Sequence, residues 1–123
     1  MISITKIFRF EAAHQLPYHQ GACKNIHGHS YILSVEVAGP VQSGNHASAG
    51  MIMDFGELKK AVNHILEKLD HHLLNEIFTN PTAEIMVEWI AQKLQGQLFP
   101  LGIEPVKVRL HETSDSYAEW REG

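Results

Sequence analysis

Alternating apolar and polar side chains predict two long strands in the first third of the chain. The first run ends at His14, and its same-face positions are Phe8, Phe10, Ala12 and His14. The second run begins at His27, and its same-face positions are His27, His29, Tyr31, Leu33, Val35 and Val37. Side chains in a strand repeat every two residues, so these sets define the buried faces of the two strands. The turn-rich residues 15–26 between them are expected to form a loop that carries Cys23.

In the middle of the chain, apolar residues recur at the spacing of a helix. Asp54 is an N-cap residue with Glu57 three positions later, which predicts a helix from about Phe55 to the region of residues 70–72. Its apolar positions recur at helical spacing and are Leu58, Val62, Ile65, Leu66 and Leu69. A second helix is expected to begin after Thr82 and to end before Pro100, with an apolar face formed by Met86, Val87, Ile90 and Leu94.

Two further strands are predicted after the second helix. Val106, Val108 and Leu110 alternate with polar residues, and a short last strand around residues 117–120 is expected to pair with this run. The order of two strands, two helices and two strands (ββααββ) predicts an α+β fold, an antiparallel four-stranded sheet with both helices on one face. The chain is expected to form a single domain over residues 1–123.

Composition and charge limit the classes of function that the protein can have. The formal net charge is −4 and the Lys and Arg residues do not cluster, which argues against a nucleic-acid partner. Cys23 is the only cysteine, so no internal disulfide can form. No apolar run approaches the ~20 residues of a membrane span, and the N-terminus lacks the features of a signal peptide. These observations predict a cytoplasmic protein with no membrane partner.

Three histidines at strand ends indicate a metal site. His27 and His29 share one face of the second predicted strand, and His14 ends the first strand on its buried face. Because one loop joins the two strands, all three imidazoles are expected to reach a single ion. Three protein ligands leave a coordination position open, which is the pattern of catalytic zinc. The alternative interpretation is that each histidine is an amphipathic side chain at a strand end.

Four other residues carry candidate chemistry. Cys23 is either a small buried side chain or, beside a metal, a thiolate that acts as base or nucleophile. Asp70 and His71 can act together only if the chain turns there, because adjacent side chains on a helix do not face each other. Glu112 falls on an apolar stripe, so its carboxylate needs a cation or a ligand with donors, unless the strand end is exposed.

These residues resemble the 6-pyruvoyl-tetrahydropterin synthase family and, within it, the bacterial 6-carboxytetrahydropterin synthase branch. The resemblance covers nearly the whole chain and rests on motifs that match in order: FEAAH at 10–14, C-x3-HGH at 23–29, MDFGELK at 53–59, LDHH at 69–72, NPTAE at 80–84 and HET at 111–113. It implies the tunnelling fold (T-fold), whose subunits assemble their sheets into barrels. Such proteins are commonly trimers stacked into hexamers, so the resemblance implies a homohexamer with active sites between subunits.

The resemblance also implies roles for individual residues. The implied zinc ligands are His14, His27 and His29, the catalytic groups are Cys23, Asp70, His71 and Glu112, and the pterin contacts are Glu112, Thr82 and Thr113. In this assignment Cys23 moves protons on the substrate side chain, and Asp70 and His71 form its relay. The implied cofactor is Zn²⁺ and the implied substrate is 7,8-dihydroneopterin triphosphate. The carboxy product is an intermediate toward queuosine.

Alternatives remain for the product and for the class of protein. The three-residue gap between Cys23 and His27 favours the carboxy-forming branch, because mammalian pyruvoyl-forming members have a longer gap. The rival activity is 6-pyruvoyl-tetrahydropterin synthesis from the same substrate. Rivals from other classes are a zinc- or pterin-binding homologue without turnover and a zinc hydrolase, the latter disfavoured because three histidine ligands need no neighbouring thiol. No role is assigned to the remaining candidates, His19, His46, His64 and His72.

Overall fold

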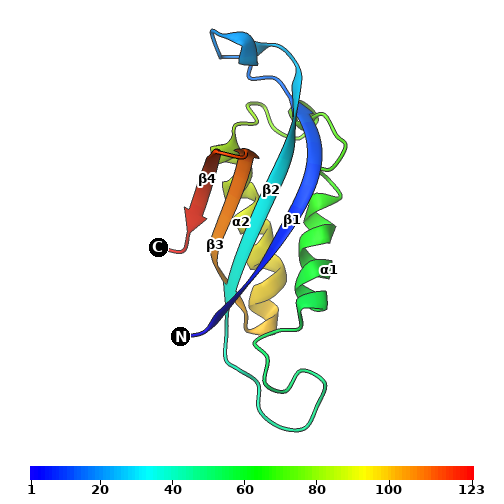
Figure 1. Cartoon of the computed structure of the whole chain (residues 1–123), viewed down its shortest axis with the longest axis vertical. Coiled ribbons are helices and arrows are strands. Elements are labelled where there is room, and N and C mark those ends of the chain that lie inside the picture. Colours follow the sequence, from blue (N-terminus) through cyan, green and yellow to red (C-terminus); the bar gives the residue numbers. More distant parts are fainter.

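A computed structural model describes all 123 residues and has the predicted order of elements (Figure 1). The strands are β1 (Ser3–His14), β2 (His27–Ala38), β3 (Glu104–Thr113) and β4 (Ser116–Arg121), and the helices are α1 (Phe55–Leu66) and α2 (Ala83–Leu98). Short 3₁₀ helices lie in the connections at Ala22–Lys24, Leu74–Glu76 and Phe99–Leu101. The ββααββ order of the α+β prediction is confirmed.

The four strands form one antiparallel sheet in the order β1-β2-β3-β4. Strands β1 and β2 pair over their full lengths, from Ser3 opposite Ala38 to His14 opposite His27. Two positions further along β2, His29 lies opposite a residue of β1 as well. This register brings the histidines at the end of β1 and the start of β2 to one corner of the sheet.

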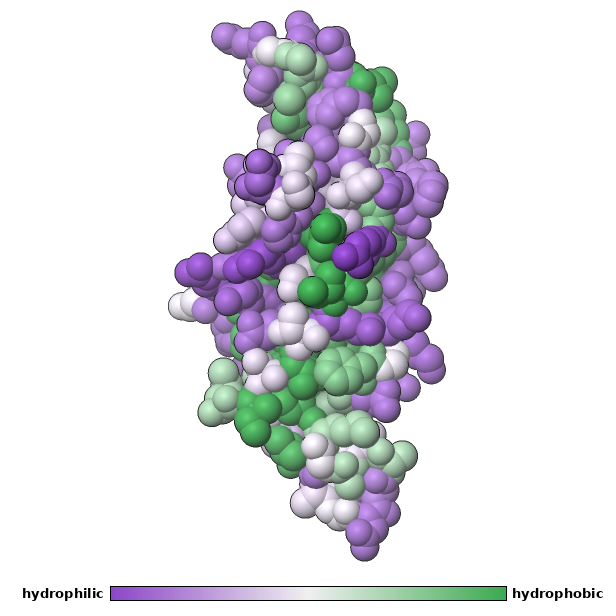
Figure 2. Space-filling view, viewed as in Figure 1, coloured by the Kyte–Doolittle hydropathy of each residue, from purple (hydrophilic) through white to green (hydrophobic).

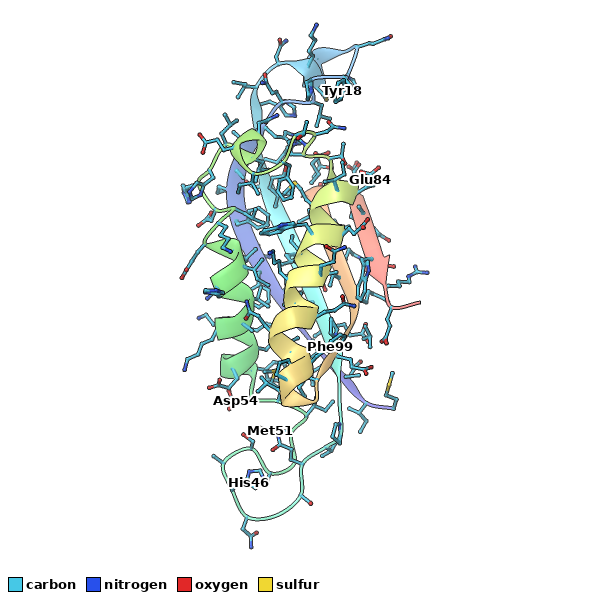
Figure 3. All side chains as sticks on the ribbon, turned by 180° about the vertical axis from the view of Figure 1, so that it is seen from behind. Tyr18, His46, Met51, Asp54, Glu84 and Phe99 are labelled. Atoms are coloured by element: carbon cyan, nitrogen blue, oxygen red, sulfur yellow. The ribbon has the colours of Figure 1, made fainter.

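Both helices cover the same face of the sheet, as the views from its two sides show (Figures 1 and 3). On β2, Tyr31, Leu33 and Val35 are fully buried beneath the helices, whereas the residues between them stay partly exposed. One cluster of 25 buried residues joins this face to the apolar sides of the helices. The opposite face carries the polar positions of the strands and is hydrophilic over much of its area (Figure 2).

Helix α1 ends at Leu66, before the predicted end near residues 70–72. The chain continues in tighter turns, in which the Leu69 N–H bonds to the Leu66 carbonyl. Leu69 is fully buried, so the helical pattern of apolar residues persists beyond the helix itself. The regular helix stops because the backbone of residues 71 and 72 forms hydrogen bonds to β1 instead.

Both predicted helix starts are confirmed. Asp54 accepts a hydrogen bond from the Gly56 N–H at the start of α1, and Thr82 Oγ1 accepts one from the Ile85 N–H at the start of α2. The second cap fixes the first turn of α2 directly after Pro81. Neither helix combines the length and the hydropathy needed to cross a membrane.

Candidate functional site

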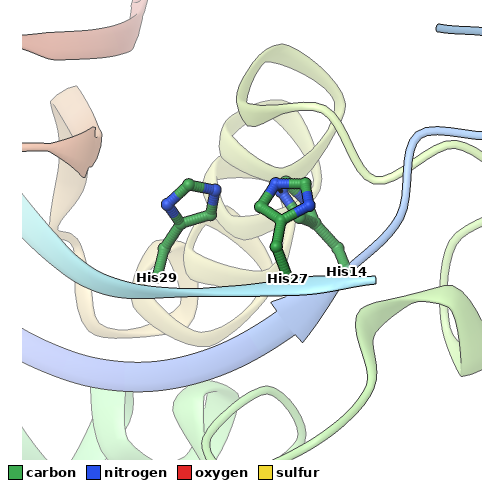
Figure 4. Close-up of side chains that lie close together, drawn as sticks. All are labelled: His14, His27 and His29. Carbon is green, nitrogen blue, oxygen red and sulfur yellow. Dashed lines mark hydrogen bonds between the residues drawn. The ribbon is translucent and has the colours of Figure 1, made fainter. Parts of the chain in front are cut away.

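The predicted histidines form one cluster at the corner where β1 ends and β2 begins (Figure 4). One nitrogen from each of His14, His27 and His29 lies within 4.8 Å of the other two. His14 is fully buried, and the other two are partly buried. The register produces this histidine cluster, because it sets His14 directly opposite His27 and places His29 two positions further along on the same face.

Hydrogen bonds determine which nitrogen of His14 and of His27 faces the cluster. His14 Nδ1 lies 2.8 Å from the Pro81 carbonyl oxygen, and His27 Nδ1 lies 2.8 Å from the Asn25 carbonyl oxygen. A carbonyl oxygen only accepts, so each Nδ1 carries the proton and each Nε2 presents a lone pair. The two Nε2 atoms are 3.0 Å apart. Two lone pairs at this separation repel unless a proton or a metal ion lies between them.

His29 adds a third nitrogen without a partner. Its Nε2 is buried and has no hydrogen bond, which is costly unless a ligand supplies the partner. Burial lowers the pKa of His14 and of His29 below the usual histidine value, with desolvation as the largest cause. Neutral imidazoles are the form that ligates metals. The donor set therefore fits a divalent ion such as zinc, with three neutral nitrogens and a fourth position for another group.

Glu112 faces the histidine cluster from β3. Its Oε1 lies 3.4 Å from His14 Nε2 and 3.7 Å from His29 Nε2. This contact explains a carboxylate on the apolar stripe of the strand, because the side chain points at imidazoles and not into hydrocarbon. The side chain is only 29% exposed, so the alternative of a freely exposed strand end is wrong.

An acidic pocket of about 480 Å³ adjoins Glu112, between α2 and β4. Its carboxylates are Glu84, Glu88, Glu112 and Glu119, of which Glu119 is already paired with two arginines. Its apolar walls include Ala83, Val87, Ala118 and Trp120. No lysine, arginine or histidine lines it. The acidic pocket therefore suits an uncharged or cationic ring that carries several hydrogen-bond donors.

Glu84 is a pocket residue that the sequence prediction missed. It lies in the first turn of α2, at the same end of the molecule as the loop that carries Tyr18 (Figure 3). An acidic residue in a first helical turn is explained by the helix dipole, so it does not stand out in a sequence. Only the packing of α2 on β4 shows that Glu84 and Glu112 share a pocket.

The two threonines expected to contact a ligand have structural partners. Thr82 Oγ1 caps α2 by accepting the Ile85 N–H. The Thr113 hydroxyl donates to Asp115 Oδ1 at 3.0 Å in the turn between β3 and β4. Neither threonine lines the acidic pocket, and their contact with a substrate stays a prediction.

Cys23 is not part of the histidine cluster. It lies half-buried in the 3₁₀ helix Ala22–Lys24, within a loop that extends beyond the end of the sheet (Figure 1). The group of ligand atoms within 4.8 Å of one another contains only imidazole nitrogens. A single chain therefore does not bring the thiol into this group, and the role of Cys23 as a base stays a prediction.

Asp70 and His71 face each other because the chain turns there. His71 is the only non-glycine residue with a positive φ, 59°, and its Nδ1 lies 2.9 Å from Asp70 Oδ1. The same carboxylate oxygen accepts the Glu11 N–H at 2.9 Å, which is the largest cause of the lowered pKa of Asp70. The turn that the Asp70–His71 pair requires is therefore present. The pair lies outside the histidine cluster of its own chain.

Residues 70–75 run along the free edge of β1 and hold it in place. The Ala13 N–H bonds to the His72 carbonyl. Asn75 continues this edge, since its Oδ1 accepts the Gln15 N–H and its Nδ2 donates to the Gln15 carbonyl, both at 2.9 Å. The Asn75 side chain thereby forms the hydrogen bonds that a neighbouring strand would form with Gln15, the residue directly after His14. The role of Asn75 cannot be read from the local sequence, because its partner lies 60 positions away.

Replacing Asn75 with alanine is expected to lower the free energy of unfolding by about 1–3 kcal/mol, because partly buried backbone groups lose their partners. Amide protons in the Cys23 loop should also exchange faster, since the first residue of the loop is no longer held. Chemical denaturation and hydrogen exchange measure the two effects. Asn63→Ala is the matched control, because Asn63 is similarly exposed and lies on α1. An equal loss of stability in both variants would contradict the role of Asn75.

The remaining histidines lie apart from the histidine cluster. His46 lies in the loop at the opposite end of the molecule (Figure 3), and His64 is exposed on α1. His19 accepts the Gly21 N–H within its own loop, and His72 Nδ1 bonds to the Asp70 carbonyl. No role is assigned to these four histidines.

Comparisons with known proteins show the family and the fold of the chain. A family model described as 6-pyruvoyl tetrahydropterin synthase matches residues 3–123. The 6-carboxy-5,6,7,8-tetrahydropterin synthase of Synechocystis sp. is 40% identical over 120 residues, which is 95% of this chain and 91% of that protein. The dihydroneopterin monophosphate aldolase of Pyrococcus furiosus is 36% identical over 89 residues, 72% of this chain and 71% of that protein. The structure of Caenorhabditis elegans 6-pyruvoyl tetrahydropterin synthase superposes with a TM-score of 0.82 at 25% identity, over 99% of this chain and 96% of that chain. The chain therefore belongs to the 6-pyruvoyl tetrahydropterin synthase family and has its tunnelling fold.

Proposed function

We propose that this protein is a zinc-dependent 6-carboxy-5,6,7,8-tetrahydropterin synthase. It converts 7,8-dihydroneopterin triphosphate to 6-carboxytetrahydropterin, with release of acetaldehyde and triphosphate, on a route to queuosine and related 7-deazapurines. The observation that carries the proposal is the histidine cluster with its facing nitrogens beside an acidic pocket. The name of the Synechocystis relative supports the choice of product.

The acidic pocket suits the pterin ring of this substrate. A pterin carries an amino group beside a ring N–H, a guanidine-like pair of donors, and one carboxylate accepts from both. Glu112 is the first acceptor in this proposal, and Glu84 in the same pocket is a second. A ring held by Glu112 directs its side chain toward the histidines that Glu112 contacts.

The residues around the side chain of the substrate handle its protons. Zinc, when bound to the histidine cluster, supplies a Lewis acid that acidifies the hydroxyl groups of the substrate. Cys23 is the proposed base that removes and returns protons on the side chain, and His71 exchanges protons with it. Asp70 orients His71 through their 2.9 Å contact, and the lowered pKa of Asp70 keeps its carboxylate charged near neutral pH.

We place Cys23 and the Asp70–His71 pair in a site shared between subunits of a homohexamer. Neither belongs to the histidine cluster of its own chain, and β1 and β4 are both outer strands of the sheet. Cys23→Ala and His71→Ala subunits, each inactive alone, should regain part of the activity when they are co-expressed. Some sites of the mixed oligomer then receive an intact thiol from one subunit and an intact relay from another. Mixed oligomers without any recovery would rule out the shared site.

His71 allows stability and function to be tested separately. A φ of 59° costs a non-glycine residue about 1 kcal/mol, whereas glycine adopts it freely. His71→Gly is therefore expected to be about 1 kcal/mol more stable than His71→Ala, while both variants lose the relay. Chemical denaturation and steady-state rates measure the two effects. Full activity in either variant would remove His71 from the mechanism.

The decisive experiment incubates the zinc-loaded protein with 7,8-dihydroneopterin triphosphate and identifies the products by mass spectrometry. A carboxy product with acetaldehyde supports the proposal. A pyruvoyl product assigns the protein to the rival activity of the family. Retention of zinc without any product indicates a binding homologue, and products of simple hydrolysis indicate a zinc hydrolase.

A second candidate function is an aldolase acting on dihydroneopterin monophosphate, the activity that names the Pyrococcus relative. That match covers 72% of this chain, against 95% for the Synechocystis relative, so it ranks second. The same assay with the monophosphate in place of the triphosphate separates the two. Faster cleavage of the monophosphate would favour the aldolase.

A further inference from the structure

We propose that Glu112 is a displaceable metal ligand. In the resting protein its carboxylate occupies the fourth coordination position, and a bound pterin ring draws it away. This inference rests on the proposed metal site and gives Glu112 a second role there. As a consequence, the metal has no open coordination position until the ring of the substrate binds.

The distances from Glu112 to two of the imidazoles come close to those between ligands of a tetrahedral site, although the imidazole nitrogens themselves lie up to 4.8 Å apart. Ligands at the ~2.0–2.1 Å bond lengths of zinc lie about 3.3–3.4 Å from one another in a tetrahedron. Glu112 Oε1 lies 3.4 Å from His14 Nε2 and 3.7 Å from His29 Nε2. The Nε2 atoms of His14 and His27 are 3.0 Å apart. The carboxylate oxygen thus stands, relative to two of the imidazoles, where a fourth ligand would stand.

The surroundings of Glu112 also require a cation. Its side chain is 29% exposed, and its Oε1 faces the Nε2 atoms of His14 and His29, whose lowered pKa favours the neutral imidazole. No lysine or arginine forms an ion pair with it. A largely buried carboxylate without a positive partner is unfavourable, whereas a divalent ion between it and the imidazoles satisfies all of these groups.

Glu112 cannot serve the metal and the pterin ring at the same time. It also lines the acidic pocket, where its carboxylate is the proposed acceptor for the donors of the ring. Binding of the ring therefore competes with ligation of the metal by Glu112. The coordination position needed by the substrate hydroxyl groups opens only when the ring is in place.

Cobalt-substituted protein reports this coordination, because the visible absorption of Co²⁺ depends on the number and type of its ligands. Glu112→Gln is expected to shift the wild-type spectrum and to raise the metal Kd about 10–100-fold. Glu88→Gln is the matched control, since it removes one charge from the same pocket without an ion pair to the histidines. It should keep the wild-type spectrum and Kd. Glu112→Asp, which retains a retracted carboxylate, should weaken metal binding less and covers the case that Glu112→Gln misfolds.

Unsubstituted pterin is the probe for displacement, because it has no side-chain hydroxyl groups that could bind the metal. At saturation it is expected to shift the wild-type cobalt spectrum toward that of Glu112→Gln. The inference is overturned if Glu112→Gln matches the wild type in spectrum and Kd, or if pterin leaves the wild-type spectrum unchanged. Failure of the proposed function is seen separately, as the absence of a carboxy product in the assay with 7,8-dihydroneopterin triphosphate. Failure of the proposed metal site is seen as wild-type protein that binds neither zinc nor cobalt.

Discussion

His14→Ala is expected to abolish stoichiometric metal binding and to lower activity at least about 10³-fold. His14 is fully buried, and the Pro81 carbonyl holds its Nδ1 so that Nε2 faces the histidine cluster. Two imidazoles do not complete a zinc site, and a catalytic metal stabilises the transition state by several kcal/mol. Since each 1.36 kcal/mol is a factor of ten in rate, a loss of about 4 kcal/mol gives this reduction. Metal content after dialysis and steady-state rates measure the two effects.

His64→Ala is the matched control for this substitution. His64 is exposed on α1 and lies outside the histidine cluster, so the variant should retain both its metal and its activity. His14→Asn keeps a polar side chain at the same position and separates loss of metal from loss of the fold, which denaturation of the metal-free proteins measures. Retention of a full equivalent of zinc by both His14 variants would contradict the proposed metal centre.

The histidine cluster could be predicted because strand geometry is periodic. His27 and His29 must share a face of β2, and His14 continues the buried stripe of β1. The remaining unknown was the register, and a loop between consecutive strands favours the antiparallel pairing that sets His14 opposite His27. The strand order and the helix starts follow in the same way, from local pattern and from capping residues.

Contacts between distant segments could not be predicted. Helix α1 ends early because residues 71 and 72 bond to β1, and nothing near Leu66 in the sequence reports that competition. Asn75 is recognisable only once its partner Gln15 is known, and Glu84 only once α2 is packed on β4. Local sequence carries periodicity and caps, whereas these roles depend on tertiary hydrogen bonds and packing.

The role of Glu112 could be predicted only in part. The apolar stripe of β3 showed that its carboxylate needed a partner, because a charge on a buried face is costly. The apolar pattern of β3 does not distinguish a cation, a ligand or solvent as that partner. The contacts at 3.4 and 3.7 Å place the carboxylate beside two imidazoles, and its position in the acidic pocket leaves a ligand as a second proposed partner.

Cys23→Ala is expected to lower turnover about 10²–10⁴-fold and to leave the metal content unchanged. The thiol is the proposed base, and general acid–base catalysis contributes on this scale. Metal content should not change, because the Cys23 thiol is not among the grouped ligand atoms of His14, His27 and His29. Steady-state rates, with zinc measured on the same samples, test both halves of the expectation.

Cys23→Ser separates proton transfer from packing. Serine has nearly the size of cysteine but a far less acidic side chain, so it should be almost as inactive as alanine if Cys23 is a base, and active if Cys23 only fills space. Gln20→Ala, at an exposed position in the same loop, should retain full activity and controls for disturbance of the loop. A Cys23→Ala protein that lost its zinc would make the sulfur a ligand contributed within the oligomer. The role of base would then pass to His71, which Asp70 already orients at 2.9 Å.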